Sequence, residues 1–240
     1  MEVNRLMGFE LALGAEIVSA AAALILAYST LRPCKSSGIQ YLLGVPAGFA
    51  LIAIGFITGI PNLAADTNVL SVRLISGIIS LLTQTYGLLF ISLTYARKTR
   101  LRILGESIIL EIAIPALITI GAVTFVLISD PASGAAISTL ETPLRIVMAL
   151  CAVYVFYETE RNWSFTQKAS EGIVAVAFGF LFIEQVGFLL MSVGFGDVAI
   201  FLGYEGRILG LIILIALTVF GIKKADSIVL KRLGLAALAH

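Results

Sequence analysis

The sequence predicts an all-α integral membrane protein with seven transmembrane helices, and three observations carry this prediction. Of the 240 residues, 59% are hydrophobic and only 13% are charged, about half the charged share of an ordinary soluble chain. The mean hydropathy is +1.04. Seven stretches long enough to cross a bilayer as helices are separated by short polar breaks. A surface with so little charge would be poorly solvated in water, so lipid is the expected solvent.

The expected spans are Gly8–Leu31, Gln40–Ile60, Val69–Ala96, Ile103–Ser129, Thr139–Tyr157, Ala169–Gly194 and Val198–Ile222. The connections at 61–68 and 130–134 are rich in Pro, Gly, Asn and Asp, as is typical of turns. Glu10 and Glu16 interrupt the first apolar stretch, which argues against a signal peptide there. Since no connection is long enough for a separate domain, residues 1–240 are expected to form one transmembrane domain.

Lysine and arginine residues concentrate on one side of this arrangement. Only Arg5 is expected on the other side. Twelve of the sixteen basic residues follow the first, third, fifth or seventh span: Arg32, Lys35, Arg97, Lys98, Arg100, Arg102, Arg161, Lys168, Lys223, Lys224, Lys231 and Arg232. Because basic residues in short loops mark the cytoplasmic side, we expect an outside N-terminus and a cytoplasmic C-terminus in the cell membrane. The tail, residues 223–240, mixes basic and apolar residues and is expected to form a short amphipathic helix on the inner leaflet.

The sequence also indicates an internal repeat. Residues 16–32 and 145–161 share seven of seventeen residues, at an offset of 129. At an offset of 134 the third and seventh spans pair Arg73 with Arg207, and Gly55-Phe56 recurs as Gly187-Phe188. We therefore expect a parallel 3+1+3 repeat, with one unit at 8–96, a connecting helix at 103–129 and the second unit at 139–222.

This layout, with its outside N-terminus, resembles the SWEET sugar transporters and the microbial rhodopsins in topology alone. The Pro-Gln pair found in the wider SWEET-like group is absent. The seventh span has no internal lysine for retinal, since Lys223 and Lys224 lie at its cytoplasmic end. No family and no cofactor are therefore assigned.

Ionisable residues within the spans are the candidate site, because each is costly to bury in a membrane. Three arginines against two deep glutamates leave one positive charge, which would suit an anionic ligand. The residues expected to form an outward-facing pocket in the outer half are Arg73, Arg207 and Glu184, with Glu16 and Arg145 as partners and Tyr204 at the rim. Alternatively these side chains pair with one another and stabilise helix packing, as Glu141 and Arg145 can at i,i+4.

Polar, small and proline residues complete the candidate site. Arg73, Gly77, Ser80, Gln84 and Gly87 recur at helical spacing and form a polar stripe that is expected to face protein or water. Two prolines are expected hinges, since proline cannot donate the helical hydrogen bond four residues back. They are Pro46, between Gly44 and Gly48, and Pro115, four residues after Glu111.

Several function classes are disfavoured by what the chain lacks. His240 is the only histidine, and Cys34 and Cys151 are the only cysteines, so histidine metal centres, a Ser-His-Asp triad and a disulfide framework are not expected. The net charge of +1 disfavours nucleic-acid binding. No motif of a known hydrolase is present, so we expect no enzyme activity and no catalytic or metal site.

The leading hypothesis is a membrane protein that binds and transports a small solute or ion. The second is a rhodopsin-like sensor or receptor without retinal that acts through a cytoplasmic partner at residues 97–102 and the tail. A structural subunit of a membrane complex is the third. Under all three, the lipid bilayer is the main partner.

Overall fold

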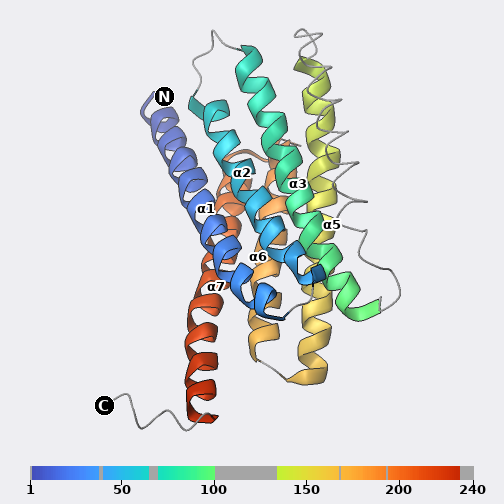
Figure 1. Ribbon diagram of the computed structural model, residues 1–240. Helices are drawn as coiled ribbons and strands as arrows, with labels where there is room; N and C mark the ends of the chain where they lie inside the picture. The colour runs from blue at the N-terminus through green and yellow to red at the C-terminus, as the bar shows by residue number, and fades with distance from the viewer. Residues whose placement is uncertain are drawn as a thin grey trace.

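The computed structural model describes residues 2–37, 40–64, 70–100, 134–167, 169–192 and 194–232. Within these ranges the chain forms six α-helices and one short 3₁₀ helix, with no strand (Figure 1). They are α1 (Glu2–Ser37), η1 (Gln40–Leu43), α2 (Gly44–Ala64), α3 (Leu70–Arg100), α5 (Gly134–Thr166), α6 (Ala169–Ser192) and α7 (Gly196–Arg232).

The all-helical, multi-pass membrane architecture is confirmed. Six of the seven expected spans fall on helices, and the fourth, Ile103–Ser129 with Pro115, lies outside the described residues. The apolar stretch of α2, Gly44–Ile60, is shorter than the others. Among the described residues, five helices contain an apolar stretch long enough to cross a membrane: Ala12–Leu31, Ser76–Ala96, Glu141–Phe165, Ser170–Met191 and Val198–Val219.

The helix ends differ from those expected at two places that matter for the site. α5 begins at Gly134 instead of Thr139, so Pro143 is its tenth residue and interrupts its hydrogen-bond ladder. α7 continues without a break from Gly196 to Arg232, so the separate interfacial helix expected from residue 223 onward is wrong for residues 223–232. No glycine or proline separates Ile222 from Arg232, and lysine, alanine and leucine favour continued helix.

Pro46 lies at the beginning of α2, not in the middle of a span. The expected second span is divided into η1 and α2, and Pro46 is the third residue of α2. The first four N–H groups of an α-helix have no intrahelical partner, so proline breaks no α-helical bond here. Pro46 is therefore tolerated just after the change from 3₁₀ to α geometry. It does not kink the middle of a helix, as the expected hinge would require.

The six helices pack as a closed ring. Each described helix packs against the next along the chain, and α7 packs back against α1. In Figure 1, α1, α3, α5 and α7 run from the end that carries the N-terminus to the end that carries the C-terminus, and α2 and α6 return. α3 thus ends at the opposite end of the bundle from the beginning of α5.

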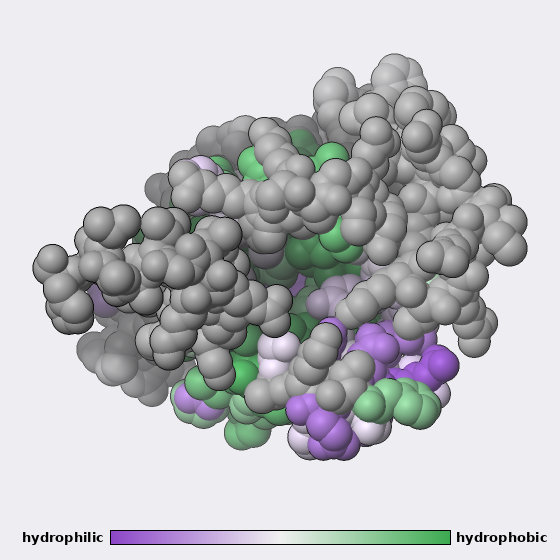
Figure 2. All heavy atoms as spheres, turned by 60° about the horizontal axis from the view of Figure 1, so that its bottom comes forward, coloured by the Kyte–Doolittle hydropathy of each residue, from purple (hydrophilic) through white to green (hydrophobic). Residues whose placement is uncertain are grey.

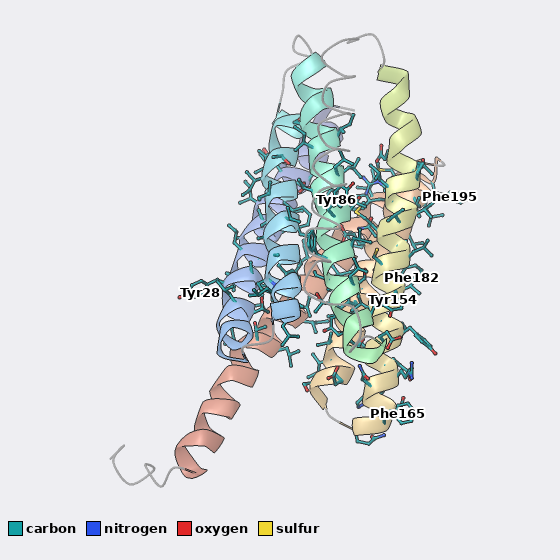
Figure 3. All side chains as sticks on the ribbon, turned by 45° about the vertical axis from the view of Figure 1, so that its right-hand side comes forward. Tyr28, Tyr86, Tyr154, Phe165, Phe182 and Phe195 are labelled. Carbon is teal, nitrogen blue, oxygen red and sulfur yellow. The ribbon has the colours of Figure 1, made fainter. Side chains whose placement is uncertain are left out.

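The outside of the ring is apolar. Large hydrophobic side chains such as Leu150, Val176 and Ile212 are more than half exposed, and the labelled Tyr28 and Phe165 point away from the bundle (Figure 3). Exposed polar residues at the end of α5 and directly after it, among them Arg161 and Gln167, lie at the end of the bundle that carries the C-terminus. In Figure 2, which turns that end toward the viewer, hydrophilic residues lie along the lower edge, beside hydrophobic ones. This distribution suits a bundle whose middle is surrounded by lipid and whose ends meet water.

Glycines allow two helix pairs to approach closely, and they do so with matching geometry. A Cβ on Gly87 would lie 2.6 Å from the carbonyl oxygen of Gly48, and one on Gly206 would lie 2.7 Å from that of Phe180. Backbones that approach this closely are typical of small-residue interfaces between membrane helices. The α2–α3 and α6–α7 pairs therefore share the same glycine-to-carbonyl contact.

A second contact repeats the relation. A Cβ on Gly55 would lie 2.9 Å from the carbonyl oxygen of Ser80, and one on Gly187 would lie 2.9 Å from that of Ala199. In both contacts the α6 residue follows its α2 counterpart by 132 positions, and the α7 residue follows its α3 counterpart by 119. The two hairpins are thus equivalent at these offsets.

Candidate functional site

A buried arginine bonded to two glutamates lies inside the ring. Arg207 Nη1 on α7 donates to Glu16 Oε1 on α1 at 2.6 Å, and Arg207 Nε donates to Glu184 Oε1 on α6 at 2.7 Å. Arg207 is 3% exposed and Glu184 is 4% exposed. Charge-assisted hydrogen bonds of this length are the strong ones, so these three side chains, hereafter the Arg207 cluster, join three helices.

Three aromatic rings surround the same guanidinium. Arg207 Cζ lies 4.5 Å from the ring centre of Phe56, 5.1 Å from that of Phe188 and 5.4 Å from that of Tyr204. Phe188 and Tyr204 also meet edge to face, with ring centres 5.3 Å apart. Cation–π contacts of this kind stabilise a desolvated arginine, which explains how one can be buried so completely.

Arg145 forms a second ion pair beside this cluster. Its Nε donates to Glu141 Oε1 at 2.8 Å along α5, and its Cζ lies 4.5 Å from the ring centre of Phe188. Phe188 therefore contacts both arginines. The Glu141–Arg145 pair at i,i+4 was expected from the sequence as a local packing interaction.

The structure brings together five of the six expected ligand-binding residues: Glu16, Glu184, Arg207, Arg145 and Tyr204. The sixth, Arg73, belongs to α3 but its side chain lies outside the described residues. At 1.5 Å per residue, its backbone lies about 10 Å further along α3 than Ser80. The packing of the two hairpins pairs Arg207 with Leu88 and not with Arg73, because their common offset is 119 and not 134. Apolar helices share residue types by chance, so an alignment based on identical residues paired Arg73 with Arg207 incorrectly.

The two polar residues of the α3 stripe are buried and bonded to each other. Gln84 Nε2 donates to Ser80 Oγ at 3.0 Å, and both side chains are less than one tenth exposed. A Cβ on Gly59 of α2 would lie 3.0 Å from Ser80 Oγ and 3.8 Å from Glu16 Oε2. Ser80 of the stripe and Glu16 Oε2 therefore both lie next to Gly59. Glu16 Oε2 accepts no hydrogen bond from the described residues.

A small cavity adjoins the Arg207 cluster. Its volume is about 20 Å³, and its nine lining residues come from α2, α3, α6 and α7. Its polar lining consists of Gln84, Glu184 and Gln185, and the rest is apolar. It therefore lies between the two equivalent hairpins, and it is far smaller than the open outer pocket that we expected from the sequence.

The balance of charge among the described side chains differs from the expected one, which also counted Arg73, whose side chain lies outside the described residues. The expected surplus left Glu141 out, but Glu141 pairs with Arg145. Arg207 is shared by two carboxylates. Among the side chains that the structure describes at this site, one carboxylate is therefore in excess, and no guanidinium is free for an anion.

Four residues of the site were not singled out as ligands or partners by sequence reasoning: Phe56, Phe188, Gln185 and Gly59. The recurring Gly-Phe pair was a usable signal for the two phenylalanines. The adjacent Glu184 and Gln185 within an apolar helix were a signal for the cavity. In the described part of the chain, no three His, Cys, Asp or Glu side chains lie together as a metal site would require.

No protein-family model, curated protein or solved structure matches this chain. The geometry of the site is therefore the basis for the functional conclusion.

Proposed function

We propose that this protein is a seven-span transporter of a small ion or solute, with the Arg207 cluster as the core of its binding site. The observation that carries the proposal is the position of this cluster, buried beside a cavity that two equivalent helix hairpins line together. Transporters built from repeats place their binding sites at the interface between the repeats. Ionisable residues within membrane spans mark ion and substrate pathways.

Matching positions of the two three-helix units surround Arg207, which supports the repeat. Phe188 follows Phe56 by 132 residues, the offset of the two hairpins, and both rings contact Arg207. Arg145 follows Glu16 by 129 residues, the offset of α1 and α5; Arg145 contacts Phe188 and Glu16 contacts Arg207. One arginine thus lies between two related halves, and a small tilt of one half would exchange its partners.

The proposal also covers the orientation of the protein and its location in the cell membrane. The end of α3 and the beginning of α5 lie at opposite ends of the bundle, as a fourth crossing between them requires. With the basic connections on the cytoplasmic side, the N-terminus is outside and the Arg207 cluster is in the outer half of the cell membrane. The sensor and structural-subunit hypotheses use the same residues as internal ion pairs, and the experiment below separates them.

The test is flux in proteoliposomes that contain a pH-reporting dye and a potential-reporting dye. Gradients of H⁺, Na⁺, K⁺ and chloride are applied one at a time. We expect flux of at least one of these ions in the wild type and its loss in Glu184→Gln, with Arg161→Gln as the control because Arg161 lies at the exposed end of α5. A chain with no flux that co-purifies with a cytoplasmic regulator would instead support the sensor hypothesis.

A further inference from the structure

The excess carboxylate of the Arg207 cluster has no compensating charge among the described side chains. The groups that face it are Arg145, paired with Glu141, from α5 and Tyr204 from α7. The described faces of α2 and α3 contribute Phe56, Gly59, Ser80 and Gln84, none of which is charged. An unpaired charge in an apolar interior is so costly that the group neutralises instead.

One atom of the cluster identifies where a neutralising proton would bind. Glu16 Oε1 accepts from Arg207, but Glu16 Oε2 is buried and has no hydrogen-bond partner within the part of the chain that the structure describes. A carboxylate can only accept hydrogen bonds, whereas a protonated carboxyl has an O–H group to donate. Ser80 Oγ and Glu16 Oε2 both lie next to Gly59, since a Cβ there would be 3.0 Å from the first and 3.8 Å from the second.

The cavity provides a second and independent indication of a ligand. Gln185 is 2% exposed, lines the cavity, and its Oε1 has no hydrogen-bond partner. A volume of about 20 Å³ exceeds the roughly 10–15 Å³ that one water molecule needs. A water here would donate to Gln185 Oε1 and contact Glu184 and Gln84. The remaining six lining residues are apolar, so the several oxygen ligands that a metal cation requires are lacking.

We propose that the Arg207 cluster binds one proton, carried by Glu16, and that a water molecule in the adjoining cavity, which Glu184 lines, is the group with which the cluster exchanges it. This inference rests on the proposed function in that it names the ion of the same site. The neutral cluster then consists of one carboxylate, one guanidinium and one carboxylic acid. Proton release to either side would leave the surplus negative charge on Glu16, buried in the cluster.

The test counts protonated carboxyls by infrared difference spectroscopy on the purified full-length protein in detergent, from the carbonyl stretch of a carboxylic acid at neutral pH. We expect one buried, protonated carboxyl in the wild type. Glu16→Gln should abolish this band, since Glu184 then pairs alone with Arg207. Glu184→Gln should also abolish it, because Glu16 becomes the sole and ionised partner. Glu160→Gln, at the cytoplasmic end of α5, is the matched control and should leave it unchanged.

Two further outcomes are decisive. A band that survives in both Glu16→Gln and Glu184→Gln, or a wild type without one whose thermal stability rises specifically with added Na⁺, would overturn proton binding. Gln185→Leu should keep the band but slow its exchange in deuterated water severalfold, and unchanged exchange would overturn the role of the cavity water. Flux of another ion without the band leaves the proposed function intact, whereas the band without any flux removes the proposed function and leaves proton binding.

Discussion

Phe56 and Phe188 contact one guanidinium, that of Arg207, from two different helices, with Arg207 Cζ 4.5 Å and 5.1 Å from their ring centres. Each phenylalanine follows a glycine, Gly55 or Gly187, at which a neighbouring helix comes close. The glycine allows the neighbouring helix to lie close, and the phenylalanine ring next to it contacts the guanidinium of Arg207. An arginine that is 3% exposed, bonded to two carboxylates and flanked by three rings has almost no contact with bulk water, so it depends on its protein partners.

That dependence predicts an asymmetric response to substitution. Arg207→Gln leaves two carboxylates buried without a partner and should lower the free energy of unfolding by about 3–5 kcal/mol. Glu184→Gln retains a neutral Glu16–Arg207 pair and should cost much less. Equilibrium unfolding in mixed micelles measures both, and equal losses in the two variants would contradict the charge balance described here.

The phenylalanines should contribute through their rings and not only through their volume. Phe56→Leu and Phe188→Leu each remove a cation–π contact and should lower the free energy of unfolding by about 0.5–2 kcal/mol beyond the packing loss. For Phe56→Leu the excess should vanish in a background in which Arg207, Glu16 and Glu184 are all Gln, and for Phe188→Leu it should vanish when Arg145 is Gln as well, because Phe188 contacts both arginines. Phe165→Leu serves as the control because Phe165 is 80% exposed; an excess that persists without the charges would argue against the contact.

The glycine contacts predict a third result. Gly206→Ala places a methyl group 2.7 Å from a backbone carbonyl oxygen, so α6 and α7 must separate and both the thermal stability and the Arg207–Glu184 bond should suffer. Gly14→Ala meets nothing within 4 Å and should be neutral or should stabilise the helix by about 0.5–1 kcal/mol. Thermal unfolding of the two variants in the same detergent gives the comparison, and similar behaviour would show that the close approach is unimportant.

Orientation can be tested at two exposed positions on opposite ends of the bundle. In a background with Cys34→Ser and Cys151→Ser, a cysteine replacing Phe195 should react with a membrane-impermeant maleimide from outside intact cells. A cysteine replacing Ser164 should react only after the membrane is opened. Both native side chains are exposed. The reverse labelling pattern, or glycosylation of Asn162 in a eukaryotic host, would contradict the proposed orientation and place the N-terminus in the cytoplasm.

Hydropathy was sufficient for the helices but not for their ends. The apolar runs located α1, α3, α5, α6 and α7 because a membrane span is a matter of length and composition. The run of lysines after Ile222 was read as a boundary, yet basic residues are good helix formers and α7 passes through them to Arg232. A charge marks where the membrane ends, not where the helix ends.

The site was predictable in its members and not in its pairings. Glu16, Glu184 and Arg207 stood out because each is an expensive residue in an apolar segment. Their hydrogen bonds to one another depend on how the helices are rotated and aligned, which the sequence alone does not specify. The offset of 134 predicted for the third and seventh spans was wrong for this reason, since the packed helices are related by an offset of 119. The recurring Gly-Phe pair was the better guide, since a glycine at a close contact is constrained by the neighbouring backbone.

The most direct test of the central claim is ion flux in proteoliposomes for the wild type and for the triple variant Glu16→Gln, Glu184→Gln, Arg207→Gln. Replacing a whole buried ion cluster by neutral residues of similar size is often tolerated, so this variant should fold with the same helix content and monodispersity. If the Arg207 cluster is the transport site, flux falls to the level of empty liposomes. Wild-type flux in the folded triple variant would show that the cluster only stabilises the bundle, and would contradict the account.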